Sequence, residues 1–193
     1  DTFGSPGDAI AQLNGRTPDN GANWTAYSGG DNTGWKTENG TALYGTSGSN
    51  SGFAGVLVGT NYFDNNPGIY VLSADLTLNH SDAGLLGLGF SEGVTTDPNT
   101  TLFSAGQATE GTPWMFLRGD GRLNVRTDAT SDIFDDTGFS TASTVNLRLE
   151  LDTTPASWTL KAFYNSTQLD LDGTGLAYTF TSNPTNIGAV GLS

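Results

Sequence analysis

Cysteine is absent from this chain of 193 residues. Disulfide bonds, thiolate nucleophiles and zinc sites built on sulfur are therefore excluded. Histidine occurs once, and His80 follows a predicted strand, where a turn residue is expected. The sequence also lacks any run of 18 apolar residues, so we expect no helix that inserts into a membrane.

Basic residues are scarce as well. Seven Lys and Arg stand against 20 Asp and Glu, which gives a formal net charge of −13. Nucleic acids and anionic membranes are bound by clustered basic side chains, so the composition argues against both partners. Cations, neutral glycans and protein surfaces remain compatible with it.

The acidic composition and the first residue of the chain both indicate where the protein is located. Acidic composition with little lysine suits exported proteins, and the chain begins at Asp1 rather than at Met. This start fits a mature form after removal of a signal peptide, or equally an excised fragment. We expect an extracellular or cell-surface location, with a virion surface as the alternative.

Glycine is abundant, with 27 residues, and Ser, Thr and Asn are frequent. This composition predicts short strands joined by tight turns. The clearest pattern runs from Thr144 to Asn165, where apolar and polar residues alternate on both sides of a turn-forming stretch, 153–157. It predicts an antiparallel hairpin with one buried face, made of Val145, Leu147, Leu149, Leu151, Trp158, Leu160, Ala162 and Tyr164.

Other segments extend the pattern to a sandwich. Residues 69–79 alternate in the same way and residues 85–90 are apolar on both faces, as in a central strand. A hairpin alone is marginal in water, so its apolar face must pack on a second sheet. The sequence therefore predicts one all-β domain over residues 1–193, a two-sheet antiparallel sandwich.

One stretch is expected to lie on the surface and two are expected as loops. Residues 41–50 are rich in Gly, Ser and Thr, residues 91–113 form the longest stretch without periodicity, and residues 128–138 are acidic. The tripeptide Arg118-Gly119-Asp120 is the sequence motif that integrins recognise, but Gly-Asp-Gly is also a common sequence of β-hairpin turns. We interpret it as a turn.

Short motifs in order along the chain carry a family resemblance: DTF, LNGRTPD and ANWTAYSG near the start, GLGF and TPWMFLR in the middle, the LRLELDTTPASWTLKAFYN hairpin, and NIGAVGL near the end. They resemble the LamG-like, concanavalin-like jelly-roll domains of bacterial exported surface proteins, including those with PEP-CTERM sorting tails, and of some phage virion proteins. The resemblance implies a jelly-roll order of strands. Such domains usually carry one more strand, of the form x-D-N-F-x-L, so a final strand is expected to be lacking after Ser193.

Two acidic segments are candidates for a structural calcium ion. Hard cations take clusters of carboxylate and carbonyl oxygens, and jelly rolls of the resembled kind commonly hold a calcium. The alternative is that these acids only solubilise loops. The candidate ligands are Asp132, Asp135 and Asp136, with Asp170 and Asp172.

Aromatic side chains with nearby polar donors predict a glycan site. Trp35 follows the polar stretch 31–34, which makes it the strongest candidate, and Tyr44 and Tyr62 are the others. Trp24, Trp114 and Trp158 lie in alternating contexts and are expected in the core. The predicted function is a non-catalytic extracellular module for glycan recognition or adhesion.

Two other function classes stay open. A structural subunit of a filament, surface layer or virion decoration would assemble by pairing edge strands, which implies a neighbouring subunit and a homo-oligomer. A glycoside hydrolase or polysaccharide lyase is the third. Glu150 and Asp152 share one strand face, but the further downstream Glu of concanavalin-like glucanases is replaced by Thr153-Thr154-Pro155.

Overall fold

The computed structural model describes residues 11–12, 15–17, 23–28, 35–38, 41–44, 52–59, 61–78, 84–91, 112–127, 132–175 and 177–192. Strands are the main secondary structure of these residues, and every strand pairing among them is antiparallel. The helical exception is α1 (Tyr62–Asn65). No helix in these ranges has the length and apolar character needed to cross a membrane.

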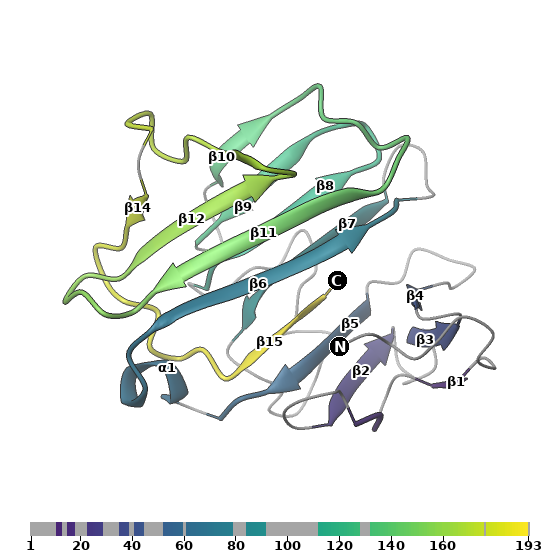
Figure 1. Cartoon of the computed structure of the whole chain (residues 1–193), viewed down its shortest axis with the longest axis horizontal. Coiled ribbons are helices and arrows are strands. Elements are labelled where there is room, and N and C mark those ends of the chain that lie inside the picture. Colours follow the sequence, from purple (N-terminus) through teal and green to yellow (C-terminus); the bar gives the residue numbers. More distant parts are fainter. Residues whose placement is uncertain are drawn as a thin grey trace.

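The strands form two large sheets. The seven-stranded sheet has the order β10 (Asp132–Asp136), β9 (Leu123–Arg126), β8 (Trp114–Arg118), β7 (Leu85–Ser91), β15 (Ala189–Leu192), β5 (Gly52–Leu57) and β2 (Trp24–Ser28). The five-stranded sheet has the order β13 (Thr167–Gln168), β12 (Thr159–Tyr164), β11 (Val145–Asp152) and β6 (Ile69–Leu76), with β14 (Tyr178–Thr179) also paired to β12. Figure 1 shows β6, β11 and β12 as a layer in front of β7, β8 and β9.

A smaller sheet stands beside them. It joins β1 (Ala11–Gln12), β3 (Trp35–Glu38) and β4 (Thr41–Tyr44), and β3 contacts β2 and β5.

The core lies between the two large sheets. β11 contacts β7 and β8, and β6 contacts β7. Burying each large aliphatic side chain of this layer contributes about 2 kcal/mol. The buried side chains that meet there include Leu88, Phe90, Met115, Leu117, Leu123 and Val125 from one sheet and Leu147, Leu149, Leu151 and Leu160 from the other. The predicted all-β, two-sheet sandwich is therefore confirmed, whereas the jelly-roll order of strands and the single domain over residues 1–193 stay predictions.

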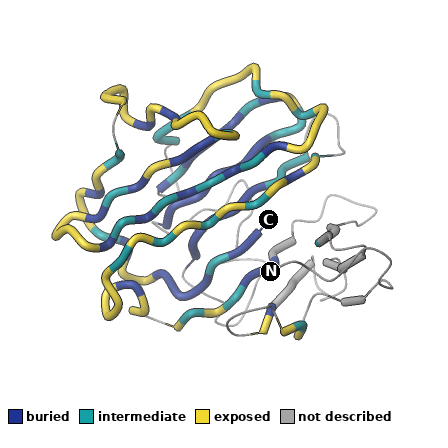
Figure 2. Tube along the Cα trace, viewed as in Figure 1, coloured by how far each residue is buried: buried dark blue, intermediate teal, exposed yellow. Residues whose placement is uncertain are grey.

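The predicted hairpin is confirmed. β11 and β12 pair over six residues, from Leu147 with Tyr164 to Asp152 with Thr159. Burial alternates strictly along β11, which Figure 2 shows as alternating dark blue and teal. The interpretation of Arg118-Gly119-Asp120 as a turn is also confirmed, because it connects β8 to β9.

The corner where β6 and β11 meet is fixed by a buried threonine. The Thr153 amide donates to the Gly68 carbonyl at 2.9 Å, and the Gly68 amide donates to Thr153 Oγ1 at 3.0 Å. β6 and β11 then pair over eight residues without a register shift. The corner therefore sets which side chains of both strands face the core.

The loop predicted over residues 128–138 is wrong, and the stretch 41–50, predicted to lie on the surface, also contains a strand. Residues 128–138 contain β10, which pairs with β9 through an irregular register between Asp132 and Phe134. The irregularity breaks the alternation of inward and outward side chains that would mark a strand in the sequence. The Arg126 ion pair neutralises Asp132, an acidic residue at the start of β10. Residues 41–50 contain β4, in which Ala42 packs against the core. Residues 92–111, the other predicted loop, lie outside the described residues.

A glycine substitution tests the packing of the seven-stranded sheet. A Cβ added at Gly87 would lie 2.7 Å from the Phe116 Cβ and against the Met115 carbonyl, so Gly87→Ala should shift backbone and destabilise the fold by about 1–3 kcal/mol. Gly68→Ala is the control, because its Cβ would make an ordinary contact of 3.7 Å with the Tyr70 ring. Urea unfolding measures both, and equal midpoints for the two variants would contradict this packing.

Candidate functional site

The candidate site is the outer face of the five-stranded sheet, defined as the side chains that point away from the seven-stranded sheet. Because side chains alternate along a strand, every second residue of β6, β11 and β12 belongs to it. Strand register arranges these residues in rows that cross the strands. The rows are Asp75 with Asn146; Ser73, Arg148, Phe163 and Gln168; Val71, Glu150 and Lys161; and Ile69, Asp152 and Thr159.

Arg148 lies in the middle of this face and is held on two sides. Its Cζ stands 3.7 Å from the centroid of the Phe163 ring, and its Nη1 lies 2.9 Å from Glu150 Oε1. The stacking leaves Phe163 only 9% exposed, although it faces away from the core. Within the described residues, Nε and Nη2 of Arg148 donate to no protein acceptor. The guanidinium is thus oriented in advance and keeps donors for a ligand.

A hydrogen-bond network orders the next row. Asn146 Nδ2 donates to Asp75 Oδ1 at 2.7 Å and to Ser73 Oγ at 3.1 Å. The main-chain amide of Asn146 donates to Asn165 Oδ1 at 3.0 Å. These contacts immobilise the polar side chains beside Arg148, so a ligand would meet few loose groups there.

Exposed apolar side chains border the polar ones. Ile69 is 66% exposed and Val71 57%, the highest values for large apolar residues in the described ranges. Both lie on β6, on the same face as Arg148. Figure 2 shows this strand alternating between exposed and half-buried residues. Apolar surface next to ordered polar groups is typical of recognition sites.

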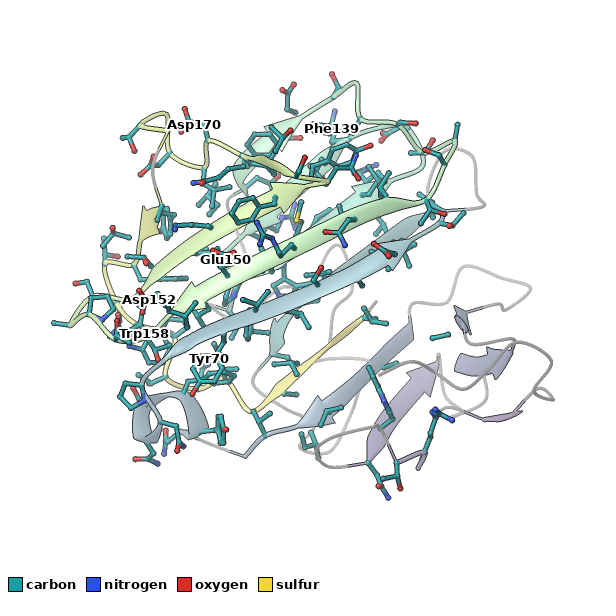
Figure 3. All side chains as sticks on the ribbon, in the orientation of Figure 1. Tyr70, Phe139, Glu150, Asp152, Trp158 and Asp170 are labelled. Atoms are coloured by element: carbon teal, nitrogen blue, oxygen red, sulfur yellow. The ribbon has the colours of Figure 1, made fainter. Side chains whose placement is uncertain are left out.

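The acids at the end of β11 are engaged locally. Thr154 donates to Asp152 Oδ1 through its hydroxyl at 2.7 Å and through its amide at 2.9 Å. Glu150 pairs with Arg148 and lies opposite Lys161. Figure 3 labels both acids on β11. Neither arrangement assembles an acid and a base around a common reacting position.

The three predicted glycan residues fall in two places. Trp35 opens β3 rather than lying in a loop, and its Cα is paired with that of Tyr44 on β4. Tyr62 lies on α1, 40% exposed, with its ring 6.2 Å from that of Tyr70. Burial, and to a lesser degree Tyr62, raises the pKa of Tyr70. Figure 1 shows α1 and the three-stranded sheet at opposite ends of the molecule, so Tyr62 cannot act with the other two.

The predicted metal ligands also divide into two groups. On β10, Asp132 accepts from Arg126 and from Asn124 Nδ2, Asp135 lies 3.6 Å from Arg122 Nε, and Asp136 accepts from the Thr137 amide at 2.7 Å. In the loop 169–175, Asp170 Oδ1 accepts from the Gly175 amide at 2.7 Å, and Asp172 accepts from Thr174. No group of three or more acids and histidines gathers within the described residues. Calcium stays a prediction.

The sequence analysis did not select Arg148 as a candidate ligand-binding residue. The alternation in residues 144–165 placed it on the solvent side, but Phe163 occupies a polar position of the same pattern. An aromatic residue on the polar side of a hairpin, directly opposite an arginine, was the available signal.

Comparisons with known proteins give no family. No protein-family model matches the chain, and neither the curated proteins nor the solved structures contain a significant match. The resemblance to LamG-like domains therefore remains an expectation from the motifs alone.

The Asp172 loop generates a prediction on titration. Thr174 donates to Asp172 Oδ1 through its hydroxyl at 2.6 Å and its amide at 3.0 Å, which lowers the pKa of Asp172. A carboxyl whose pKa is lowered by folding stabilises the fold above its unfolded pKa, and this contribution is lost as the pH falls through the folded pKa. Thr174→Val should raise the pKa of Asp172 toward its ordinary value, as measured by carboxyl NMR titration.

The matched control for this titration is Thr154→Val, which removes the equivalent hydroxyl beside Asp152. It should leave Asp172 unchanged. An Asp172 pKa that does not rise in Thr174→Val would show that the hydroxyl bond is not what lowers it.

Proposed function

We propose that this chain is a non-catalytic extracellular module that recognises glycans at a cell or particle surface, and that the outer face of the five-stranded sheet is its binding surface. The observation that supports this best is Arg148, stacked on Phe163 and paired with Glu150 beside the two most exposed apolar side chains of the described residues. Sugars present hydroxyls and apolar C–H faces together, and this face offers partners for both.

The charge of the chain supports the same choice. A net charge of −13 disfavours nucleic acid and anionic membranes, as long-range repulsion would oppose the encounter. A glycan without charge meets no such barrier. The expected location is extracellular, on a cell or a virion, and a calcium ion at Asp170 and Asp172 is proposed only as a structural support.

A glycan array tests the proposal. The wild-type chain should be retained on at least one polysaccharide, and Arg148→Ala should weaken retention tenfold or more, because it removes both the donors and the cover of Phe163. Arg122→Ala is the matched control: it deletes another arginine that pairs with an acid, but one outside this face. It should bind like the wild type.

The same array also tests which sheet carries the binding surface. If Trp35→Ala abolished retention while Arg148→Ala left it intact, the binding surface would be on the three-stranded sheet. Absence of retention of the wild type on every glycan would contradict the proposed function itself.

The edge of the five-stranded sheet favours a second candidate, a structural subunit that assembles by strand pairing. β6 ends this sheet, and none of the other described strands pairs with its second side. Edge strands are usually protected by Lys, Pro or a bulge, whereas β6 reads IYVLSADL and pairs with β11 without irregularity. Backbone groups on that side could accept a strand from a neighbouring subunit.

Light scattering separates the two candidates. A strand-paired assembly predicts dimers or larger species whose mass increases with protein concentration. Because each copy carries −13, association should strengthen as added salt screens the repulsion. A monodisperse monomer at all salt concentrations would contradict the structural-subunit candidate and leave glycan recognition unaffected.

A further inference from the structure

We infer that the ligand of the outer face is an uncharged, extended polysaccharide that crosses the strands along one row of side chains, Ser73, Arg148, Phe163 and Gln168. This inference rests on the proposed function and specifies the ligand class and its direction. It follows from three properties of the row: its charge, its spacing and the chemistry of its ends.

The charge of the face excludes a preference for acidic sugars. Arg148 is already neutralised by Glu150 at 2.9 Å, and Lys161 lies opposite the same Glu150 in the strand register. With Asp75 and Asp152 included, the face carries one more acid than base. An anionic ligand would have to displace Glu150 from Arg148 or accept repulsion from three carboxylates, whereas neutral hydroxyls can accept from the remaining guanidinium donors without either cost.

The row has a regular spacing across the sheet. Ser73 on β6, Arg148 on β11, Phe163 on β12 and Gln168 on β13 are successive register partners. Neighbouring strands lie about 4.8 Å apart, so the row spans about 14 Å. This step is close to the length of one sugar in an extended hexopyranose chain. A polysaccharide that crosses the strands would therefore place successive sugars over successive strands.

The two ends of the row carry neutral hydrogen-bonding groups. Ser73 has a hydroxyl that is held by Asn146, and Gln168 has an exposed amide. A path along β11 instead would run from Asn146 and Arg148 onto Glu150 and Asp152, two carboxylates already engaged with Arg148 and Thr154. Val71, in the adjacent row, adds an apolar surface for the C–H groups of a sugar. The crossing direction thus meets neutral hydrogen-bonding groups at both ends and the Arg148 guanidinium between them, whereas the strand direction leads onto two carboxylates.

Calorimetric titration with oligosaccharides of defined length tests the inference. The probes are neutral β-1,4-linked hexopyranose oligomers and uronate oligomers of the same lengths. Affinity for the neutral series should rise with length and level off at about four sugars, when one sugar lies over each of the four strands of the row. Uronate oligomers should bind at least tenfold more weakly, and Glu150→Gln should narrow that gap because it removes the anion that neutralises Arg148.

Variants at the row and beside it complete the test. Gln168→Ala should make the affinity level off one sugar earlier, whereas Thr159→Ala, on the same face but outside the row, should leave the length dependence unchanged. Tight uronate binding, or an affinity independent of length, would overturn the inference while glycan recognition stands. If no oligomer of either series binds the wild type although the array shows retention on another glycan, the inference fails and glycan recognition stands. If the wild type is retained on no glycan at all, the proposed function fails.

Discussion

The pairing of β6 with β11 is the constraint on which the rest of this molecule depends. Eight residue pairs run without a shift, and the Thr153 and Gly68 hydrogen bonds close one end of the ladder. Since side chains alternate with a period of two, a slip by one residue would move Leu147, Leu149 and Leu151 out of the core and put Arg148 and Glu150 into it. The cost of burying those charges makes the register effectively unique.

The same alternation links the hydrophobic core to the proposed binding face. The leucines of β11 join the two sheets, and the residues between them form the outer face. Arg148 can remain oriented there because Phe163 and Glu150 are fixed to neighbouring backbone positions rather than to loops. A site on paired strands loses less conformational entropy on binding than one on flexible segments.

Sequence reasoning recovered the parts of the fold that have a regular period. The hairpin of residues 144–165 and the strand from Ile69 follow apolar alternation, and both are present with the predicted faces inward. β10 was not predicted because its irregular register with β9 hides the period of two, and β4 was not predicted because the Gly-, Ser- and Thr-rich residues 45–50 that follow it dominate the composition of that stretch. The sequence pattern of a single segment does not show which other strand it pairs with in the folded protein.

The candidate site on the outer face could not be predicted from the sequence, for a physical reason. A stacked pair such as Arg148 and Phe163 arises from cross-strand register, and the two residues are 15 positions apart in the sequence. Composition had directed attention to aromatic residues in polar surroundings, but Trp35 belongs to a strand and Tyr62 to a helix at another end of the molecule. Only the pairing of β11 with β12 brings the contributing groups together.

Hydroxyl-radical footprinting, with and without a glycan that the chain retains, tests the central claim most directly. Ile69 and Val71 lie beside the outer-face row and are highly exposed, so both should lose reactivity when the ligand binds. Leu57 and Tyr62, exposed elsewhere, are internal controls and should react as before. Protection of Tyr62 or Leu57 with Ile69 and Val71 unchanged would contradict the assignment of recognition to this face.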